Sequence, residues 1–327
     1  MGLVSGKCLT SKRLDGITAV ITGCNTGIGK ETAKDFYLRG ARVIMACRDL
    51  QKAQQAADDI RKSCINQEGI VGDEINKNLT KLGDIVIVPL DLTSFESIRN
   101  CAKHILQTES KLQLLINNAG VMACPQMKTK DGFEMQFGTN HLGHFLLTML
   151  LLPLLIESRP SRIVTVSSVA HSHGGNIDFT DLNYERRSYS SIGAYQQSKL
   201  ANVLFSKELA KRLKTKYPEV TTYSLHPGII HTDLGRHLDS TIFPGMRWIW
   251  RSIIGPWFAK TPQQGAQTTI YCAVDEQCEE ESGLYYSDCR AVRPSRAALD
   301  EEAAVKLWEI SLKLVGIEND PLSLASL

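Results

Sequence analysis

Residues 21–31 have the sequence ITGCNTGIGKE and continue an apolar run that begins at Ile17. Three glycines, Gly23, Gly27 and Gly29, stand where that run ends and a segment of helical periodicity begins. Glycines at such a junction let the backbone approach a pyrophosphate, to which the following helix presents free N–H groups. The stretch therefore predicts a strand–turn–helix unit that binds a dinucleotide, and a glycine-rich turn without a ligand is the weaker alternative. The expected cofactor-binding residues are Gly23, Cys24, Asn25, Thr26, Gly27, Ile28 and Gly29.

The alternation of strand and helix continues along the chain. Apolar, β-branched runs predict strands at residues 17–22, 41–47, 85–89, 112–117, 162–167, 221–225 and 284–286. Segments with helical periodicity lie between them, at residues 27–39, 50–63, 94–108, 131–157 and 194–216. Strands that are apolar along their length indicate a mostly parallel sheet with helices on both faces. We therefore expect a doubly wound α/β (Rossmann) fold as one domain over residues 15–317, with tails at 1–14 and 318–327.

Three local features add detail to this expectation. Asp49 and Thr93 stand where helix N-caps belong, and Thr93 with Glu96 has the pattern of a capping box. Residues 65–83 are polar and predict a surface insertion before the third strand. Residues 234–260 hold three of the four tryptophans among prolines and glycines. That segment is too interrupted for a membrane span and too apolar for a free loop, so we expect a substrate cap over the carboxyl ends of the strands.

The composition argues against several classes of protein. A net charge of +2 over 327 residues, without a long basic run, gives no indication of nucleic acid binding. The nine cysteines form no C-x-x-C pair, which favours reduced thiols inside the cell. The longest apolar run, residues 145–156, contains Pro153 and is too short to cross a bilayer, so it predicts a buried helix. We expect an intracellular protein, cytoplasmic or peripheral on a membrane, without a transmembrane anchor.

The residue after the second strand indicates which dinucleotide is bound. An acidic side chain there binds the ribose of NAD, whereas an arginine accepts the 2′-phosphate of NADP. The second predicted strand ends at Cys47, and Arg48 is the first charged residue after it, while Asp49 is better placed as a helix cap. We therefore expect NADP(H) as the cofactor, with an uninvolved surface arginine as the alternative.

The stretch AYQQSKLAN, residues 194–202, places Tyr195 and Lys199 one helical turn apart on the same face. A free tyrosine has a pKa of about 10 and is a poor base at neutral pH. A neighbouring lysine cation stabilises the phenolate, so we expect Lys199 to lower the pKa of Tyr195 and to allow proton exchange with a reacting alcohol or carbonyl. A half-buried tyrosine beside a solvated lysine is the alternative, and Ser168 at a predicted strand end favours the catalytic interpretation.

Together these motifs resemble the short-chain dehydrogenase/reductase family over residues 15–315. Residues 22–29 are similar to its TGxxxGIG motif and residues 117–120 to its NNAG motif. Asp91 with Leu92 resembles its adenine-contacting pair, and Pro227-Gly228 with Thr232 resembles the PGxxxT stretch beside the nicotinamide. The resemblance implies further cofactor contacts from Asp91, Leu92, Asn118, Tyr195, Lys199, Pro227, Gly228 and Thr232.

The resemblance also implies a catalytic set of four residues. Tyr195 corresponds to the acid/base, and Lys199 to the residue that tunes it and holds the nicotinamide ribose. Ser168 corresponds to the hydrogen-bond partner of the substrate carbonyl, and Asn140 to the anchor of a water molecule that leads to Lys199.

Within the family, the stretches TGCNTGIGKETA, TNHLGHFLL and AYQQSKLANVLF resemble the retinol dehydrogenase branch that includes NADP-preferring retinal reductases. This implies hydride transfer between NADP(H) and a lipophilic carbonyl or alcohol, with retinal and retinol as the first choice. The alternatives are another apolar carbonyl, such as an isoprenoid, steroid or lipid aldehyde, and a non-catalytic NADP-binding regulator. Two features depart from the branch: we expect no N-terminal membrane anchor, and the 65–83 insertion is longer than usual.

Two other kinds of site are less favoured by the sequence. Ser168 with His171 or His173 would suit a serine hydrolase, but no G-x-S-x-G turn surrounds the serine. His141 and His144 share a predicted helix but have no third ligand at a recognisable spacing, so we expect no metal site.

The predicted cap also indicates a possible partner. Trp248, Trp250 and Trp257 are interspersed with Arg247 and Arg251, and this combination favours the headgroup region of a bilayer. We expect a small lipophilic substrate, no nucleic acid, and peripheral, salt-sensitive membrane contact through residues 242–258. A lid whose tryptophans face only the substrate is the alternative, and the sequence leaves the oligomeric state open.

Overall fold

The computed structural model describes residues 6–68, 81–230 and 260–322. Within this part of the chain, eight strands form one sheet in the order β3-β2-β1-β4-β5-β6-β7-β8. Neighbouring strands are parallel from β3 to β7, and β8 pairs antiparallel with β7. The strands are β1 Thr18–Thr22, β2 Arg42–Cys47, β3 Asp84–Pro89, β4 Leu114–Asn117, β5 Ser161–Val166, β6 Val220–His226, β7 Tyr285–Ser287 and β8 Arg290–Ala291.

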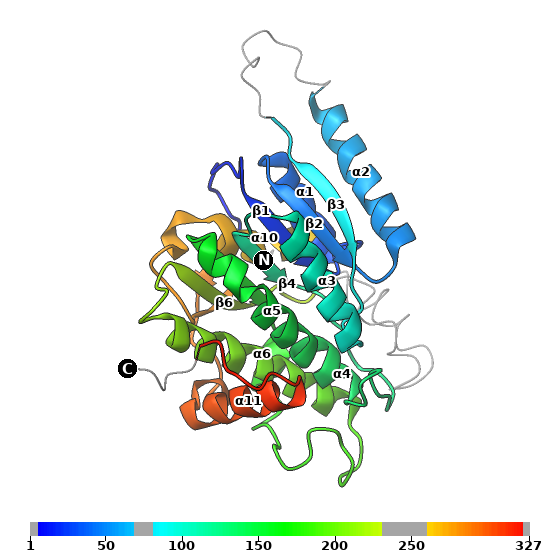
Figure 1. Ribbon diagram of the computed structural model, residues 1–327, viewed down its shortest axis with the longest axis vertical. Helices are drawn as coiled ribbons and strands as arrows, with labels where there is room; N and C mark the ends of the chain where they lie inside the picture. Colours follow the sequence, from blue (N-terminus) through cyan, green and yellow to red (C-terminus); the bar gives the residue numbers. More distant parts are fainter. Residues whose placement is uncertain (1–5, 69–80, 231–259, 323–327) are drawn as a thin grey trace, which may run out of the picture.

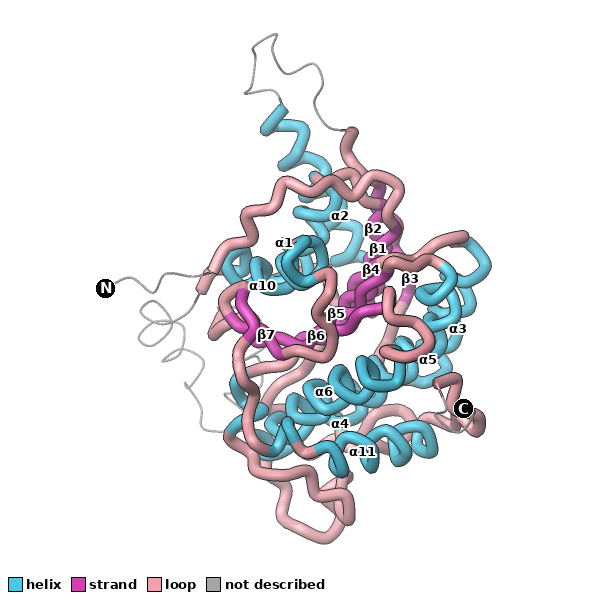
Figure 2. The backbone as a smooth tube through the Cα atoms, turned by 90° about the vertical axis from the view of Figure 1, so that its left-hand side faces the viewer, coloured by secondary structure: helices cyan, strands magenta, loops and turns pink. Residues whose placement is uncertain are grey.

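Helices cover both faces of the sheet, as Figure 2 shows edge-on. One face carries α1 (Gly27–Leu38), α2 (Leu50–Glu68) and α10 (Pro262–Val274), whose buried side chains belong to one apolar cluster. The other face carries α3 (Phe95–Thr108), α5 (Gly143–Glu157) and α6 (Ser191–Leu213), and α11 (Glu301–Leu314) packs on the outside of α6 (Figure 1). This is the expected doubly wound α/β arrangement.

All seven predicted strands are confirmed to within two residues of their ends. The physical reason is burial on both faces, since every residue of β1 and of β5 is buried. Such strands are apolar along their whole length and stand out in the sequence. The two-residue β8 was not predicted, because it lies at the exposed edge of the sheet and carries no apolar run.

The helix predicted over residues 131–157 is wrong at its N-terminal end. The Glu134 side chain accepts hydrogen bonds from the backbone N–H groups of Gln136 and Phe137, so helical structure begins only at Met135. A three-residue α4 (Met135–Phe137) leads into a π-helical turn (Gly138–Leu142), which continues directly into α5. Pro153 lies inside α5, as expected for the buried apolar run.

The N-cap of α3 is also corrected by the structure. Ser94, not Thr93, accepts the capping hydrogen bond from the Ser97 N–H group, while the Thr93 hydroxyl donates instead to Asp91. Asp49 is confirmed as a cap, because its side chain accepts from the Lys52 N–H group at 3.0 Å.

Two expectations concern segments that the structure describes only in part. Helix α2 extends to Glu68, so the polar insertion begins later than residue 65, and residues 69–80 lie outside the described residues. The expected cap over residues 234–260 lies outside them as well, except for Lys260.

Helices α10 and α11 were not predicted. Helix α10 opens with a complete capping box, in which Thr261 and Gln264 bond each other's backbone N–H groups, and it has Pro262 in its first turn. These are recognisable start signals that the prediction overlooked. Asp300 caps α11 by accepting from the Ala303 N–H group, and Glu301 and Glu302 occupy its first turn.

The strand order reverses between β1 and β4, and this switch point positions the site. In open parallel sheets, ligands bind beside the carboxyl ends of the strands at such a reversal. The helical stretch Met135–Glu157 is longer than the apolar run at residues 145–156 and, against the expectation from that run, is long and apolar enough to span a membrane. As expected for a buried helix, 83% of its most apolar window is buried inside the protein.

Candidate active site

The turn after β1 is shaped by its glycines. Gly23 has φ of +61°, and a side-chain carbon there would lie 2.7 Å from the Ala119 methyl group. A side-chain carbon at Gly29 would lie 2.5 Å from the Asn118 side-chain nitrogen. Only glycine fits at either position. The absence of side chains there allows the turn to pack tightly against the chain after β4.

The N-terminus of α1 fits the pyrophosphate of a dinucleotide. The N-cap residue Thr26 makes no side-chain capping bond, and the first turn of the helix contains no acidic residue. Its first N–H groups and the positive end of the helix dipole are therefore free to bind an anion.

Thr22, the last residue of β1, connects three elements of the site. Its hydroxyl oxygen accepts hydrogen bonds from the N–H groups of Asn118 and Ala119, each at 2.9 Å. The same oxygen lies 2.9 Å from His144 Nε2, and His144 Nδ1 lies 2.9 Å from the carbonyl oxygen of Asn140. Burial lowers the pKa of His144 to about 4, so the ring is neutral. Because Nδ1 must donate to the carbonyl, Nε2 accepts from the Thr22 hydroxyl.

The residues expected to bind the adenosine half lie at the ends of β2 and β3. Arg48 is exposed, and within the described residues it forms no hydrogen bond or ion pair, so its guanidinium is available to a ligand. Asp91 accepts from the Thr93 N–H and hydroxyl groups and pairs with Lys130 at 3.0 Å. Burial raises the pKa of Asp91, but the bonds from Thr93 and Lys130 outweigh it and leave the pKa low. The Leu92 side chain is buried in the core, so only its backbone can meet a cofactor.

The structure brings Tyr195, Lys199 and Ser168 together. Tyr195 and Lys199 are 7% and 3% exposed, and Lys199 Nζ lies 5.7 Å from the centre of the Tyr195 ring. Lys199 Nζ also donates to the carbonyl oxygen of Val166, at the end of β5, at 3.1 Å. The Ser168 hydroxyl lies just beyond that strand, where it hydrogen-bonds Tyr195 and accepts from the Ala170 N–H group.

The expected lowering of the Tyr195 pKa by Lys199 is wrong for the chain without cofactor. Burial raises the pKa of Tyr195 to about 12, and only its hydrogen bond with Ser168 acts in the opposite direction. Burial also lowers the pKa of Lys199 to about 8. Each group is therefore pushed toward its neutral form, because desolvation outweighs their mutual attraction.

Asn140 lies in the π-helical turn, a feature often found at functional sites. Its side chain is fixed in place, because it exchanges two hydrogen bonds with the backbone of Val121 and donates a third to Ser198. A side-chain carbon at Gly120 would lie 3.3 Å from Asn140 Oδ1 and 3.6 Å from Lys199 Nζ. Asn140 and Lys199 therefore border the same small space above Gly120.

Two further residues support the site: His171, which the sequence suggested only as a hydrolase partner of Ser168, and Tyr285, for which the sequence indicated no role. His171 donates from Nδ1 to the carbonyl oxygen of Ser168 at 2.7 Å, and its Nε2 accepts from the Ser295 N–H group. Its ring packs on Tyr285 with the centroids 4.7 Å apart, and the pKa of Tyr285 is raised by burial and by its neighbour Tyr195. His171 thus supports the backbone of Ser168 and does not contact its hydroxyl, which argues against a serine hydrolase.

The remaining expected residues lie near the end of β6. Gly228 follows Pro227 with φ of +97°, and a side-chain carbon there would lie 2.7 Å from the Lys260 side chain. Lys260 pairs with Asp288 after β7. Thr232 lies outside the described residues, and in the described part of the chain no group of three histidine, cysteine or acidic side chains could hold a metal ion.

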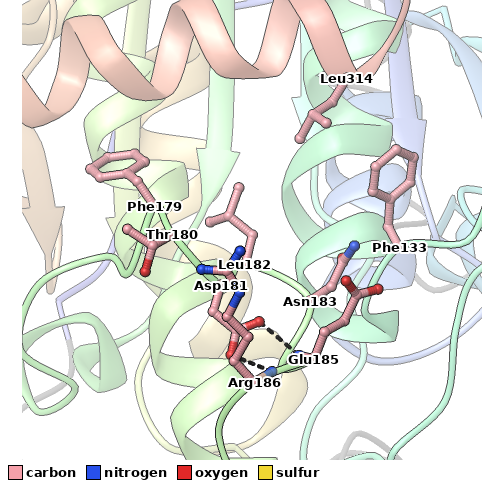
Figure 3. Close-up of a pocket in the computed structure, with 9 residues that line it drawn as sticks. All are labelled: Phe133, Phe179, Thr180, Asp181, Leu182, Asn183, Glu185, Arg186 and Leu314. Carbon is pink, nitrogen blue, oxygen red and sulfur yellow. Dashed lines mark hydrogen bonds between the residues drawn. The ribbon is translucent and has the colours of Figure 1, made fainter.

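A separate hollow of about 170 Å³ lies away from these residues (Figure 3). It is lined by the loop at residues 179–186 with Phe133 and Leu314. The Asp181 carboxylate organises this loop by accepting from the N–H groups of Glu185 and Arg186 at 2.7 and 3.1 Å. None of the expected catalytic or cofactor-binding residues lines the hollow, so it is not the candidate active site.

Comparison with known proteins identifies the family. The short chain dehydrogenase family model matches residues 17–73 and 66–242. Retinol dehydrogenase 11 of Mus musculus is 49% identical, covering 97% of this chain and 92% of its own, and retinol dehydrogenase 12 of Homo sapiens is 48% identical, covering 95% and 90%. Among solved structures, an uncharacterized protein from Mycobacterium paratuberculosis is 36% identical with a TM-score of 0.71, covering 93% of this chain and 95% of its own. The NADP complex of Pseudomonas aeruginosa RhlG, at 24% identity and a TM-score of 0.61, covers 84% and 94% and shares the fold. The chain therefore belongs to the short chain dehydrogenase family of NAD(P)-dependent oxidoreductases.

Proposed function

We propose that this protein transfers hydride between NADP(H) and a lipophilic carbonyl or alcohol, with retinal and retinol as the preferred pair. The observation that carries this proposal is the buried group of Tyr195, Lys199 and Ser168 beside the switch point of the sheet. When bound, the nicotinamide supplies or accepts the hydride, and the remaining chemistry falls to the protein's own side chains.

Tyr195 is suited to donate the proton that carbonyl reduction requires. With a pKa of about 12 it is fully protonated at neutral pH. Ser168 already hydrogen-bonds Tyr195, so a carbonyl oxygen bound between the two hydroxyls is positioned to receive the proton. Lys199, with a pKa of about 8, is mostly charged at neutral pH and stabilises the phenolate that remains. Asn140 and Lys199 border the space through which a water molecule would return the proton.

An apolar substrate is supported by the surface around this group. Val169, Ile192 and Ile229 are 41%, 41% and 44% exposed. They come from three separate segments: the residue after Ser168, the first turn of α6 ahead of Tyr195, and the turn after β6. Exposed large apolar side chains that lie next in sequence to, or one helical turn from, the expected catalytic and cofactor-binding residues favour a ligand that covers them. The 49% identity to a retinol dehydrogenase makes retinal the leading candidate.

The choice of NADP over NAD is supported by Arg48. Its exposed guanidinium directly follows β2, while the adjacent Asp49 side chain is engaged in capping α2. An arginine in this place can form a charge-assisted hydrogen bond with the 2′-phosphate that NADP carries and NAD lacks.

A substrate panel tests the proposal. Purified protein is given NADPH or NADH with all-trans-retinal, a steroid ketone, an isoprenoid aldehyde and a short polar aldehyde, and cofactor oxidation is followed. We expect turnover with NADPH, fastest with retinal and slowest with the polar aldehyde. Preference for another apolar carbonyl would replace the retinoid assignment, and absence of turnover with every compound would favour the non-catalytic regulator.

A further inference from the structure

Two thiols meet at the dinucleotide end of the site. Cys24 lies in the glycine-rich turn after β1, and Cys47 is the last residue of β2, directly before Arg48. Their sulfur atoms are 3.8 Å apart, and the two residues are 0% and 2% exposed. Both are free thiols that contact each other across the neighbouring ends of two paired strands.

We propose that Cys24 and Cys47 form a reversible disulfide that weakens dinucleotide binding, so that oxidation by a hydroperoxide switches the enzyme off. The proposal requires only the family's dinucleotide site at this turn. It is independent of the substrate and of the preference for NADP proposed above.

The surroundings assign different roles to the two thiols. The Cys24 thiol donates to the Ile21 carbonyl oxygen at 3.1 Å, and burial raises its pKa well above the ordinary value. The pKa of Cys47 is lowered, first by its hydrogen bond with Cys24 and then, against burial, by the backbone N–H groups of Cys24 and Asn25. The turn that leads into the pyrophosphate-binding end of α1 thus also presents the N–H groups of Cys24 and Asn25 to the Cys47 sulfur. Cys24 is completely buried and its thiol hydrogen is held by the Ile21 carbonyl oxygen, whereas Cys47 keeps 2% exposure, so we assign Cys47 as the nucleophile and Cys24 as the resolving thiol.

The chemistry balances with one hydroperoxide per disulfide. The Cys47 thiolate attacks the peroxide oxygen and breaks the O–O bond, which gives a sulfenic acid and an alkoxide, or hydroxide when hydrogen peroxide is the oxidant; this takes up the proton that the Cys47 thiol lost and leaves as an alcohol or as water. The Cys24 sulfur then attacks the Cys47 sulfur, its proton leaves with the displaced hydroxide as water, and the S–S bond forms. Two electrons pass from the two thiols to the peroxide, and two electrons from a dithiol reductant reverse the reaction.

Closing this bond requires the two side chains to move toward each other. A disulfide has an S–S length of about 2.0 Å, so sulfur atoms now 3.8 Å apart have to approach each other. Cys24 is flanked by Gly23, which is packed against Ala119 so closely that a side-chain carbon there would lie 2.7 Å from the Ala119 methyl group. The turn therefore has little freedom to follow Cys24 without disturbing the N–H groups meant for the pyrophosphate. We expect affinity for the dinucleotide to fall about tenfold, equivalent to losing one charge-assisted hydrogen bond.

Peptide mapping combined with cofactor titration tests the switch. Cofactor-free enzyme is treated with a small excess of hydrogen peroxide, remaining thiols are blocked by alkylation, and proteolytic peptides are analysed by mass spectrometry. NADPH affinity is measured on the same samples by fluorescence, before and after treatment with dithiothreitol. Cys24→Ala and Cys47→Ser each remove one partner, and Cys101→Ala serves as the matched control, because Cys101 is equally buried but lies on α3 in the other helical layer. Each variant is compared with its own reduced form.

The expected result is a cross-linked peptide pair containing Cys24 and Cys47, formed together with a weakening of NADPH binding that dithiothreitol reverses. Wild type and Cys101→Ala should both show it, both single-partner variants should lack it, and NADPH added before peroxide should slow cross-linking. If no such peptide pair forms while other cysteines become oxidised, or if it forms and NADPH affinity stays unchanged, the switch is refuted.

Discussion

Replacing Lys199 with methionine should stabilise the fold while it removes activity. Lys199 is 3% exposed, and burial lowers the pKa of its ammonium group from 10.5 to about 8. One pKa unit corresponds to ~1.36 kcal/mol, so keeping this group charged inside the folded protein costs about 3 kcal/mol at neutral pH. Methionine has a similar length and carries no charge, and Val166 keeps a donor for its carbonyl oxygen in Asn202 Nδ2 at 3.2 Å.

The stability difference between wild type and Lys199→Met should depend on pH. Between the folded pKa of about 8 and the unfolded value of 10.5, the unfolded chain binds more protons at Lys199 than the folded chain does. Wild-type stability should therefore gain from this residue as the pH rises through that window. The advantage of Lys199→Met should shrink from about 3 kcal/mol at pH 7 to roughly half of that near pH 9.5.

Urea unfolding of the cofactor-free protein at these two pH values measures the effect. Lys211→Met is the matched control, because Lys211 lies on the same helix with an exposed side chain that pairs with Glu301. It should change the free energy of unfolding by less than about 0.5 kcal/mol at either pH. A Lys199→Met variant that is less stable than wild type, or whose advantage does not depend on pH, would show that the ammonium is not held at a desolvation cost.

Three further predictions concern other parts of the site. Arg48→Ala should weaken NADPH binding about tenfold to a hundredfold and leave NADH binding almost unchanged. The control variant Lys52→Ala, four residues further along, should change the binding of neither cofactor. Equal losses of affinity for both cofactors in Arg48→Ala would show that Arg48 does not contact the 2′-phosphate. Thr22→Val should lower the free energy of unfolding by at least about 2 kcal/mol in urea titrations, because two N–H groups and a histidine lose their common partner, and a change below about 0.5 kcal/mol would contradict the connecting role of this hydroxyl. Wild type should float with anionic liposomes at low salt more than the Trp248→Ala, Trp250→Ala variant, and equal behaviour of the two would favour a lid that faces only the substrate.

The fold could be predicted from the sequence largely because the sheet is buried on both faces. Strands such as β1 and β5 are apolar throughout, and helices separate them regularly. The predictions failed where a local side-chain bond outweighed periodicity. The Glu134 side chain caps the backbone so that helical structure begins only at Met135, not at residue 131 as predicted. Ser94 forms the capping hydrogen bond that was expected of Thr93.

The candidate site was predictable as a set of residues but not as an arrangement. Motifs pointed to Tyr195, Lys199 and Ser168, and the structure places these side chains together. The contact of Thr22 with His144 joins residues 122 positions apart, and no pattern in the local sequence predicts it. The prediction of a lowered Tyr195 pKa was wrong for a related reason. The sequence shows the neighbouring charge of Lys199 but not the burial of Tyr195, whose effect on the pKa is larger.

The turnover of Tyr195→Phe, measured together with its affinity for NADPH, tests whether Tyr195 is the proton donor. Phenylalanine keeps the buried ring and removes only the hydroxyl that hydrogen-bonds Ser168. We predict that carbonyl reduction with the best substrate of the panel falls by about 10²- to 10⁴-fold, while NADPH binds with an affinity within about twofold of wild type. Turnover near the wild-type rate, with NADPH binding intact, would contradict the assignment of Tyr195 as the proton donor and with it the proposed mechanism.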